Sequence, residues 1–190
     1  MAEMTCRRLA DHLVRLEMIS RERADAGLAA IAEYAPDHDE VLEYDDLLEA
    51  LGEFGVAVFV HGGDVDDLAE SYEEILTKAA ACTGGAVAVS GVELVADEDG
   101  DEQLNFRLNG EPRSWPVEHQ ADDYLDQLAV WEYIDDLDPG GDDPRVFHAV
   151  PGEDGGHDDV YVLATNAQAC ALRDDLGLKI DVRDRPEAAE

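Results

Sequence analysis

The chain of 190 residues is strongly acidic: 47 Asp and Glu residues stand against 13 Lys and Arg residues, and the formal net charge is -34. Hydrophobic residues make up 45% of the chain, which is ordinary for a globular protein and excludes a disordered acidic polymer. Such a charge repels nucleic acid and anionic membranes and attracts basic partners. We therefore expect a basic protein partner, with no direct nucleic-acid binding and no membrane partner.

The cysteines and the N-terminal segment bear on the compartment. Cys6, Cys82 and Cys170 are odd in number and show no CxxC spacing, which fits reduced thiols better than a disulfide framework or a zinc knuckle. No secretory signal is visible, and the apolar runs are far shorter than the ~20 residues that cross a bilayer. The sequence predicts a cytoplasmic protein and indicates no cofactor.

The N-terminal segment differs in charge from the rest of the chain. Leu9, Leu13 and Leu16 recur at helical spacing within residues 1–35. Five arginines against six acidic residues give this segment a charge of -1, so residues 36–190 carry -33. The sequence predicts a helical N-terminal segment, a single α+β domain and a mobile tail, at residues 1–35, 36–180 and 181–190.

The next predicted elements are a helix, a strand and a second helix. Residues 41–54 carry leucines at helical spacing, and Gly55 is a plausible stop. Residues 56–60 (VAVFV) form a continuous β-prone run, which predicts a central strand that is buried on both faces. An apolar stripe from Leu68 to Cys82 predicts the following helix.

The clearest local pattern is a three-stranded meander. The dipeptides Asp99-Gly100 and Asn109-Gly110 suit tight hairpin turns with positive φ. In the middle strand, alternate residues are apolar, so one face is expected to be buried. The three predicted strands span residues 86–95, 103–108 and 113–117.

The C-terminal half adds two helices and two strands. An amphipathic helix is expected over residues 122–137, strands over 145–150 and 159–164, and a helix over 166–176. The sequence therefore predicts an α+β fold: an antiparallel sheet of about five or six strands built on the meander, with helices packed mainly on one face.

Two Gly-rich or acidic loops invite a functional interpretation. The run Asp97–Glu102 places acidic residues around a glycine, but no register supplies the ligands of an EF-hand, so we interpret it as a hairpin turn. The segment Phe59–Asp64 (FVHGGD) follows a strand, yet it lacks the lysine of a P-loop, and no GxSxG motif accompanies it. A turn followed by a helix cap explains this segment.

An alternative interpretation is a metal site. His148, His157, Asp158 and Asp159 lie on a strand and in the loop that follows it, which can converge around a divalent metal. Their spacing matches no defined metal signature. This hypothesis would make the chain a small metal-dependent hydrolase or transferase, with His61 as a further candidate ligand.

Partner-binding candidates come from aromatic residues near acidic pairs. Trp115 lies in a Pro-flanked strand, and Trp131 lies on a predicted helix. Aromatic side chains beside carboxylates are typical anchors of interfaces that select basic partners, although core packing is the alternative for both. The acidic candidates beside them are Asp122, Asp123, Asp135 and Asp136.

These observations lead to one principal functional hypothesis. We expect a non-enzymatic acidic binding protein that engages a basic partner, by blocking a toxin or by imitating the charge of nucleic acid. The layout of helices around a sheet with an acidic surface resembles that of small acidic bacterial immunity proteins and antitoxins, by analogy of layout and without a shared motif. A soluble domain whose acidity reflects salt adaptation is a further alternative.

Overall fold

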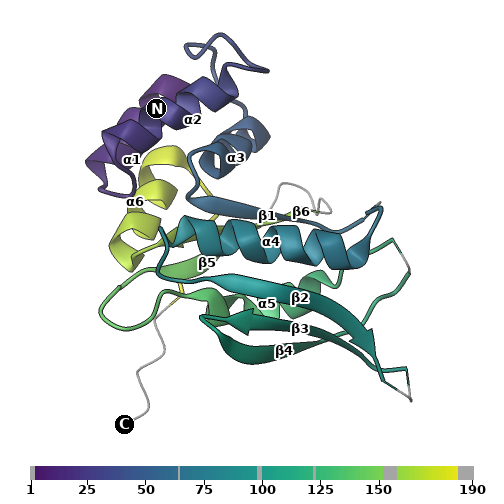
Figure 1. The fold of residues 1–190 in the computed structure, drawn as a ribbon. Coiled ribbons are helices and arrows are strands. Elements are labelled where there is room, and N and C mark those ends of the chain that lie inside the picture. Colours follow the sequence, from purple (N-terminus) through teal and green to yellow (C-terminus); the bar gives the residue numbers. More distant parts are fainter. Residues whose placement is uncertain (1–2, 64, 98–99, 122, 152–157, 184–190) are drawn as a thin grey trace.

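The computed structural model describes residues 3–63, 65–97, 100–121, 123–151 and 158–183. Within these ranges the chain forms six α-helices, one short 3-10 helix and six strands, which make two three-stranded antiparallel sheets (Figure 1). The predicted α+β class and the helical N-terminus are confirmed. Among the described helices, none is both long and apolar enough to cross a bilayer.

The first sheet has the strand order β1-β6-β5. Strand β6 (Asp158–Ala164) is central, and it pairs with β1 (Ala57–His61) on one side and with β5 (Val146–Pro151) on the other. The strand predicted over residues 56–60 therefore exists, but it lies at an edge instead of the centre. Its apolar residues are buried because other layers cover both faces of the sheet, and that burial does not depend on a second neighbouring strand.

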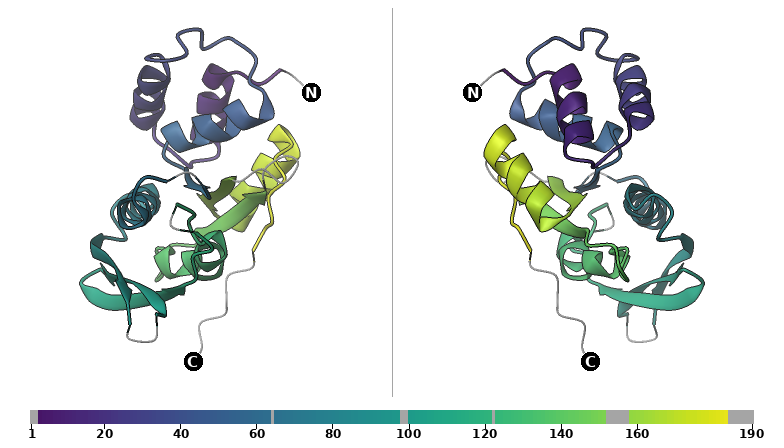
Figure 2. Two further views of the ribbon diagram at one scale, coloured as in Figure 1. Left: turned by 90° about the vertical axis from the view of Figure 1, so that its right-hand side faces the viewer. Right: turned by 90° about the vertical axis from the view of Figure 1, so that its left-hand side faces the viewer.

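One face of the first sheet packs on a layer of four helices. Val160, Val162 and Ala164 of β6 share a hydrophobic core with this layer. Figure 2 shows the helices above the sheet. They are α1 (Cys6–Arg15), α2 (Arg21–Ile31), α3 (Tyr44–Glu53) and α6 (Asn166–Leu176).

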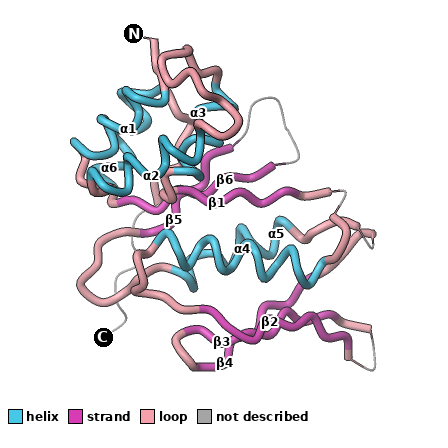
Figure 3. Tube along the Cα trace, turned by 45° about the horizontal axis from the view of Figure 1, so that its top comes forward, coloured by secondary structure: helices cyan, strands magenta, loops and turns pink. Residues whose placement is uncertain are grey.

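The opposite face of the first sheet contributes to a second core. Tyr161 and Leu163 of β6 point into it, because successive side chains of a strand face opposite sides. This core lies around α4 (Leu68–Cys82), which runs between the two sheets (Figure 3). The first sheet therefore has helices on both faces, whereas the prediction placed them mainly on one.

The second sheet is the predicted meander. It consists of β2 (Val89–Ala96), β3 (Glu102–Leu108) and β4 (Glu111–Val117) in that order. Asn109 and Gly110 adopt φ values of 52° and 87°, which is the left-handed conformation that a tight hairpin of this kind requires. Helices cover one face of this sheet, and the other face carries exposed polar side chains.

The helix expected over residues 122–137 is shorter than predicted. It divides into α5 (Gln127–Tyr133) and the 3-10 helix η1 (Ile134–Leu137). The carboxylate of Asp126 accepts a hydrogen bond from the amide of Ala129 at 3.0 Å, which fixes the helix start four residues after Asp122. The helix stripe that faces the second core therefore differs from the predicted one.

The N-terminal segment is docked on the rest of the chain. The guanidinium group of Arg23 donates hydrogen bonds to the carbonyl oxygens of Phe54 at 3.0 Å and Gly55 at 2.8 Å. Gln168 donates to the carbonyl of Leu16 at 2.9 Å. Residues 6–31 thus share one core with the first sheet, while the boundaries drawn at residues 35 and 180 stay predictions.

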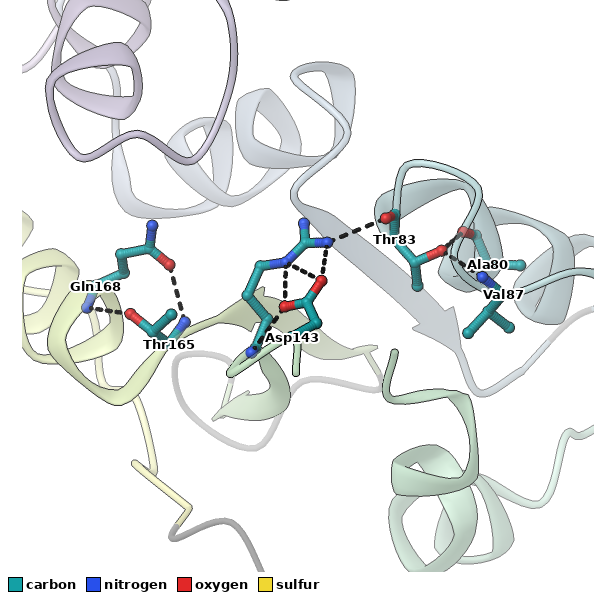
Figure 4. Close-up of polar contacts among 7 residues, drawn as sticks. Ala80, Thr83, Val87, Asp143, Thr165 and Gln168 are labelled. Atoms are coloured by element: carbon teal, nitrogen blue, oxygen red, sulfur yellow. Dashed lines mark hydrogen bonds and ion pairs between the residues drawn. The ribbon is translucent and has the colours of Figure 1, made fainter. Parts of the chain in front are cut away.

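Figure 4 shows two polar clusters, of which one joins distant segments and the other caps a helix. Arg145, at the start of β5, donates to Asp143 at 2.6 Å and to the carbonyl of Thr83 at 3.0 Å, just after α4. The hydroxyl of Thr83 accepts from the amide of Val87 at 3.0 Å. In the second cluster, Thr165 caps α6 by accepting from the amide of Gln168.

The chain leaves α6 along the outer edge of β5. The amide of Asp181 donates to the carbonyl of Ala149 at 2.9 Å, and the amide of Arg183 donates to Nδ1 of His148 at 3.1 Å. The tail predicted to be mobile begins at Asp181, so its first three residues are bound to the sheet. Residues 184–190 lie outside the described residues.

Candidate functional site

Exposed apolar side chains concentrate around α5. Six large hydrophobic side chains are exposed among the described residues, and three of them are Tyr124 (42% exposed), Leu128 (67%) and Trp131 (50%). Leu128 and Trp131 share one side of the helix, because residues three apart are neighbours on a helix surface. We call the side chains of Leu128 and Trp131 the α5 surface.

The local sequence explains why these side chains face outward. Ala129 and Val130 are buried and pack toward the second core. Asp126 fixes this orientation, because one carboxylate oxygen caps α5 and the other accepts from the amide of Glu118 at 2.8 Å. With that face of the helix buried, Leu128 and Trp131 can only project into solvent.

A hollow with an acidic lining adjoins the α5 surface. Its volume is about 550 Å³, and it lies between α5 and the strands β3 and β4, with Leu128 among its lining residues. The described residues that line it include no lysine or arginine, and the sequence has none from Ser114 to Pro144. Its carboxylates belong to Asp101, Glu102, Glu118, Asp126 and Glu132.

A chain of hydrogen bonds lies beside this hollow. Oη of Tyr72 is 2.9 Å from Nε2 of His119, and Nδ1 of His119 is 2.7 Å from the carboxylate of Glu102. The Tyr72 oxygen also accepts a hydrogen bond from the amide of Asp126 at 3.0 Å, so this hydroxyl contacts both His119 and the residue that caps α5.

These hydrogen bonds between Tyr72, His119 and Glu102 have a structural role. Tyr72 is fully buried, and burial raises its pKa far above the usual value, so its hydroxyl stays protonated at neutral pH. The chain ties α4, β3 and the segment after β4 together. No sequence signal predicts it, since Tyr72, Glu102 and His119 come from distant segments with no characteristic spacing.

An arginine of the protein itself, Arg183, contacts Trp131 of the α5 surface. The guanidinium carbon of Arg183 lies 5.7 Å from the centre of the Trp131 ring, within the range of a cation–π interaction. The same group donates to the carbonyl of Trp131 at 3.1 Å. Trp131 therefore has the geometry to accept a basic side chain on its exposed face.

The structure separates the predicted partner-binding residues. Trp131, Asp123 and Asp135 are exposed, whereas Trp115 is only 1% exposed. Trp115 packs edge-on against Phe106, with ring centres 5.2 Å apart. It is a core residue and offers no surface anchor, because β4 turns it toward α5 and η1.

Two of the acidic candidates, Asp136 and Asp122, stand apart from the others. Asp136 accepts a hydrogen bond from Nε1 of Trp115 at 2.9 Å, so one of its oxygens is engaged inside the structure. Asp122 lies outside the described residues. Of the predicted partner-binding set, the exposed residues are thus Asp123, Trp131, Asp135 and Asp136, and one oxygen of Asp136 is bound to Trp115.

The alternative metal interpretation loses its principal ligand. His148 is 0% exposed; its Nδ1 accepts from the amide of Arg183, which leaves Nε2–H to donate to the carbonyl of Ala164 at 3.1 Å. Burial lowers the pKa of His148, which favours this neutral form. Both ring nitrogens are occupied, so neither can bind a metal without breaking these bonds.

Of the other proposed metal ligands, the structure describes the side chain of Asp159. Asp159 is partly buried on β6, while His157 and the side chain of Asp158 lie outside what the structure describes. Among the described residues, no group of three or more His, Cys, Asp or Glu side chains could hold a metal ion.

Two of the three cysteines, Cys6 and Cys82, are unsuited to nucleophilic chemistry. Cys6 and Cys82 are buried free thiols, and burial raises the pKa of Cys82 to about 11. Both side chains therefore stay protonated at neutral pH and behave as small apolar groups.

Comparisons with family models, with curated proteins and with solved structures found no significant match to this chain.

Proposed function

We propose that this chain is a non-enzymatic binding protein that engages a basic protein partner through the α5 surface. The observation that carries the proposal is the exposure of Leu128 and Trp131 beside a hollow that is lined by five carboxylates and, among the described residues, by no lysine or arginine. Exposed apolar anchors that are surrounded by like-charged groups are typical of interfaces that select a partner of opposite charge.

The two components of this surface have different roles in binding. Covering a leucine and a tryptophan removes apolar area from water and contributes roughly 2 kcal/mol for each side chain. The surrounding carboxylates raise the rate of encounter with a cationic protein and disfavour anionic ones. Affinity thus comes mainly from Leu128 and Trp131, and selectivity comes from the acidic lining.

The contact between Arg183 and Trp131 supports a basic partner in particular. It shows that a guanidinium group fits on the exposed indole face while donating to the backbone of α5. A partner arginine would make the same contacts and would displace Arg183, which belongs to the last described residues of the chain. We therefore expect arginine among the partner residues that are buried on binding.

The basic partner is either a toxin that the chain blocks or a nucleic-acid-binding protein. In the second case, the chain occupies the basic face that otherwise binds nucleic acid. The encounter takes place in the cytoplasm, which suits the three free cysteines.

A pull-down with matched variants tests the proposal. The full chain, the double variant Leu128→Ser/Trp131→Ala and the control Val95→Ser are immobilised and exposed to a lysate of the source cells at about 0.1 M and about 0.5 M salt. Val95 is also an exposed apolar residue, but it lies on the second sheet.

The proposal expects one basic protein on the wild-type chain and on Val95→Ser, less of it at high salt, and none on the double variant. Equal retention by the double variant would mean that net charge alone captures the protein. Retention of nothing specific would favour acidity as an adaptation to salt.

A further inference from the structure

The two edges of the first sheet differ in how the chain covers them. At the β5 edge, Asp181 and Arg183 donate their amides to Ala149 and His148, so a segment of the chain lies along the strand. At the other edge, the strands of the described residues give β1 one partner, which is β6. An edge strand presents backbone donors and acceptors that can pair with another chain.

The register shows which groups of β1 face outward. The amide of Leu163 in β6 donates to the carbonyl of Val56 at 2.9 Å. Since backbone groups alternate in direction along an antiparallel strand, Val58 also faces β6, and Ala57 and Phe59 face the free edge. The thiol of Cys82, 3.6 Å from the carbonyl oxygen of Ala57, agrees with this direction.

A groove follows the free edge of β1. Its volume is about 600 Å³, and it lies between α3 and α4, with Ala57, Val58 and Phe59 among its lining residues. In Figure 1, β1 runs between these two helices. Ala57 is nearly buried and Phe59 is partly exposed, so Phe59 offers the more accessible amide and carbonyl.

A glycine in α3 lets the Phe59 ring pack closely against this helix at the groove. A Cβ atom at Gly52 would lie 3.1 Å from Cε2 of the Phe59 ring, which is tighter than an ordinary contact. Glycine inside a helix costs roughly 0.5–1 kcal/mol relative to alanine, so its presence here is explained by the close approach of the Phe59 side chain. The groove is thus shaped by the packing of α3 on β1.

The charges at the groove favour a basic occupant. Glu49 and Glu53 of α3 line it, both are exposed, and within the described residues neither forms an ion pair. Lys78, the basic residue in the described lining, is paired with Glu74 at 2.6 Å. The two carboxylates of α3 are therefore available for cationic side chains of a ligand.

We propose that this groove binds an extended basic segment of a partner protein, which adds to the first sheet as a strand alongside β1. Main-chain hydrogen bonds to Phe59 supply affinity, and the carboxylates of Glu49 and Glu53 select lysine or arginine side chains. This site is separate from the α5 surface, and the inference holds whether or not that surface binds a partner.

The charge of the chain argues against a second copy as the occupant. Each copy carries a formal charge of -34, so two copies repel each other at a groove that is itself acidic. Strand addition by an unrelated basic segment encounters no such repulsion. Dimers that form through the β1 edge would therefore contradict the proposal.

Fluorescence polarisation with a synthetic probe tests this inference. The probe is a labelled peptide of alternating lysine and valine residues, measured with the full chain at about 0.15 M salt. Its first control carries N-methyl groups on alternate backbone amides, which block strand pairing and retain the charge. Its second control replaces lysine with glutamate.

Two pairs of variants separate the backbone from the charge. Phe59→Pro removes the outward amide, whereas Phe59→Leu keeps it and controls for the lost aromatic packing. Glu49→Gln/Glu53→Gln removes the groove carboxylates, and Glu93→Gln/Glu111→Gln makes the same change of net charge on the second sheet.

We expect the probe to bind the wild-type chain, Phe59→Leu and the second-sheet variant within about twofold of one another. Binding should weaken about tenfold in Glu49→Gln/Glu53→Gln, which corresponds to about 1.4 kcal/mol, and should be lost in Phe59→Pro. Neither control peptide should bind. Equal binding of the N-methylated probe, no binding of the probe, or dimers of the chain in place of a complex would overturn the proposal.

Amide hydrogen exchange in the wild-type chain gives a result that depends on no variant. The outward amide of Phe59 should exchange quickly in the free protein and slowly with the probe bound. The amide of Val58 faces β6 and should be slow in both states. Unchanged exchange at Phe59 in the presence of saturating probe would also overturn strand addition.

Discussion

The indole N–H of Trp115 donates a hydrogen bond to the carboxylate of Asp136 across 2.9 Å. Trp115 belongs to β4 and Asp136 to η1, so this bond joins the second sheet to the helices that cover it. The ring also stacks on Tyr133, with ring centres 5.9 Å apart. A residue that could have been a surface anchor is thereby fixed in the core.

The substitution Trp115→Phe should lower the free energy of unfolding by about 2–4 kcal/mol. It removes a hydrogen bond to a charged acceptor and leaves part of the tryptophan volume empty. Urea denaturation followed by circular dichroism measures the effect. Asp136→Asn, which keeps an acceptor oxygen, should cost less. An equal loss in both variants would contradict this account of the bond.

The substitution Gly27→Ala should destabilise the protein, although alanine is the better helix former by about 1 kcal/mol. A Cβ atom at position 27 would clash with Cδ1 of Phe54, and the packing of α2 on α3 cannot accept this contact without a shift. Thermal unfolding of Gly27→Ala, alone and combined with Phe54→Leu, tests this explanation. The smaller leucine should recover part of the loss, and a stabilised single variant would refute the clash.

His148 should make a contribution to stability that decreases as the pH drops from about 7.5 to about 5. Burial lowers its pKa below the ordinary value of 6.5, so in this range the unfolded chain binds a proton that the folded chain excludes. The contribution is fully present above pH 6.5 and is lost as the pH falls toward the lowered pKa.

The variant His148→Gln isolates that contribution. Its urea midpoint should change less between the two pH values than that of the wild-type chain, whatever its stability at neutral pH. His12, whose pKa burial also lowers, should retain its part of the slope. Identical slopes in the variant and the wild-type chain would exclude a role for His148.

Salt should stabilise the folded chain. A net charge of -34 makes the compact state repel itself. Raising the salt from about 0.01 M to about 1 M shortens the screening length from about 30 Å to about 3 Å. Urea midpoints in sodium chloride and in potassium chloride should therefore rise together. A midpoint that is independent of salt would show that the carboxylates lie too far apart to interact.

The local elements of the fold could be predicted from the sequence because their signals are local. The hairpin at Asn109 and Gly110 follows from the conformations that these two residues tolerate. The burial of Leu104, Phe106 and Leu108 follows from their alternation along β3. Each of these signals acts within a few residues and needs no knowledge of the tertiary contacts.

The arrangement of the sheets could not be predicted in the same way. The apolar run at residues 56–60 reports burial of both faces, and it does not distinguish a central strand from an edge strand that lies between helical layers. For the same reason the division into two sheets was missed. Strand order depends on contacts between distant residues, such as Ala57 with Val162.

The features of the candidate site could also be predicted only in part. The sequence treated Trp131 and Trp115 alike, whereas the structure exposes the first and buries the second, because composition does not reveal which side chains face the core. A regular amphipathic helix over residues 122–137 would place Leu128 in its apolar stripe. The cap at Asp126 changes that orientation, and only the structure shows that Asp126 is held in place by the amide of Glu118.

Strand β6 divides its side chains between the two hydrophobic cores, with Val160 and Val162 in one and Tyr161 and Leu163 in the other. Disrupting the packing of either core therefore also destabilises the other core, because both depend on the backbone of β6. The molecule should melt as one cooperative unit, with a calorimetric enthalpy equal to the van't Hoff value. A fragment that lacks either layer would keep half of β6 facing water and would fail to fold.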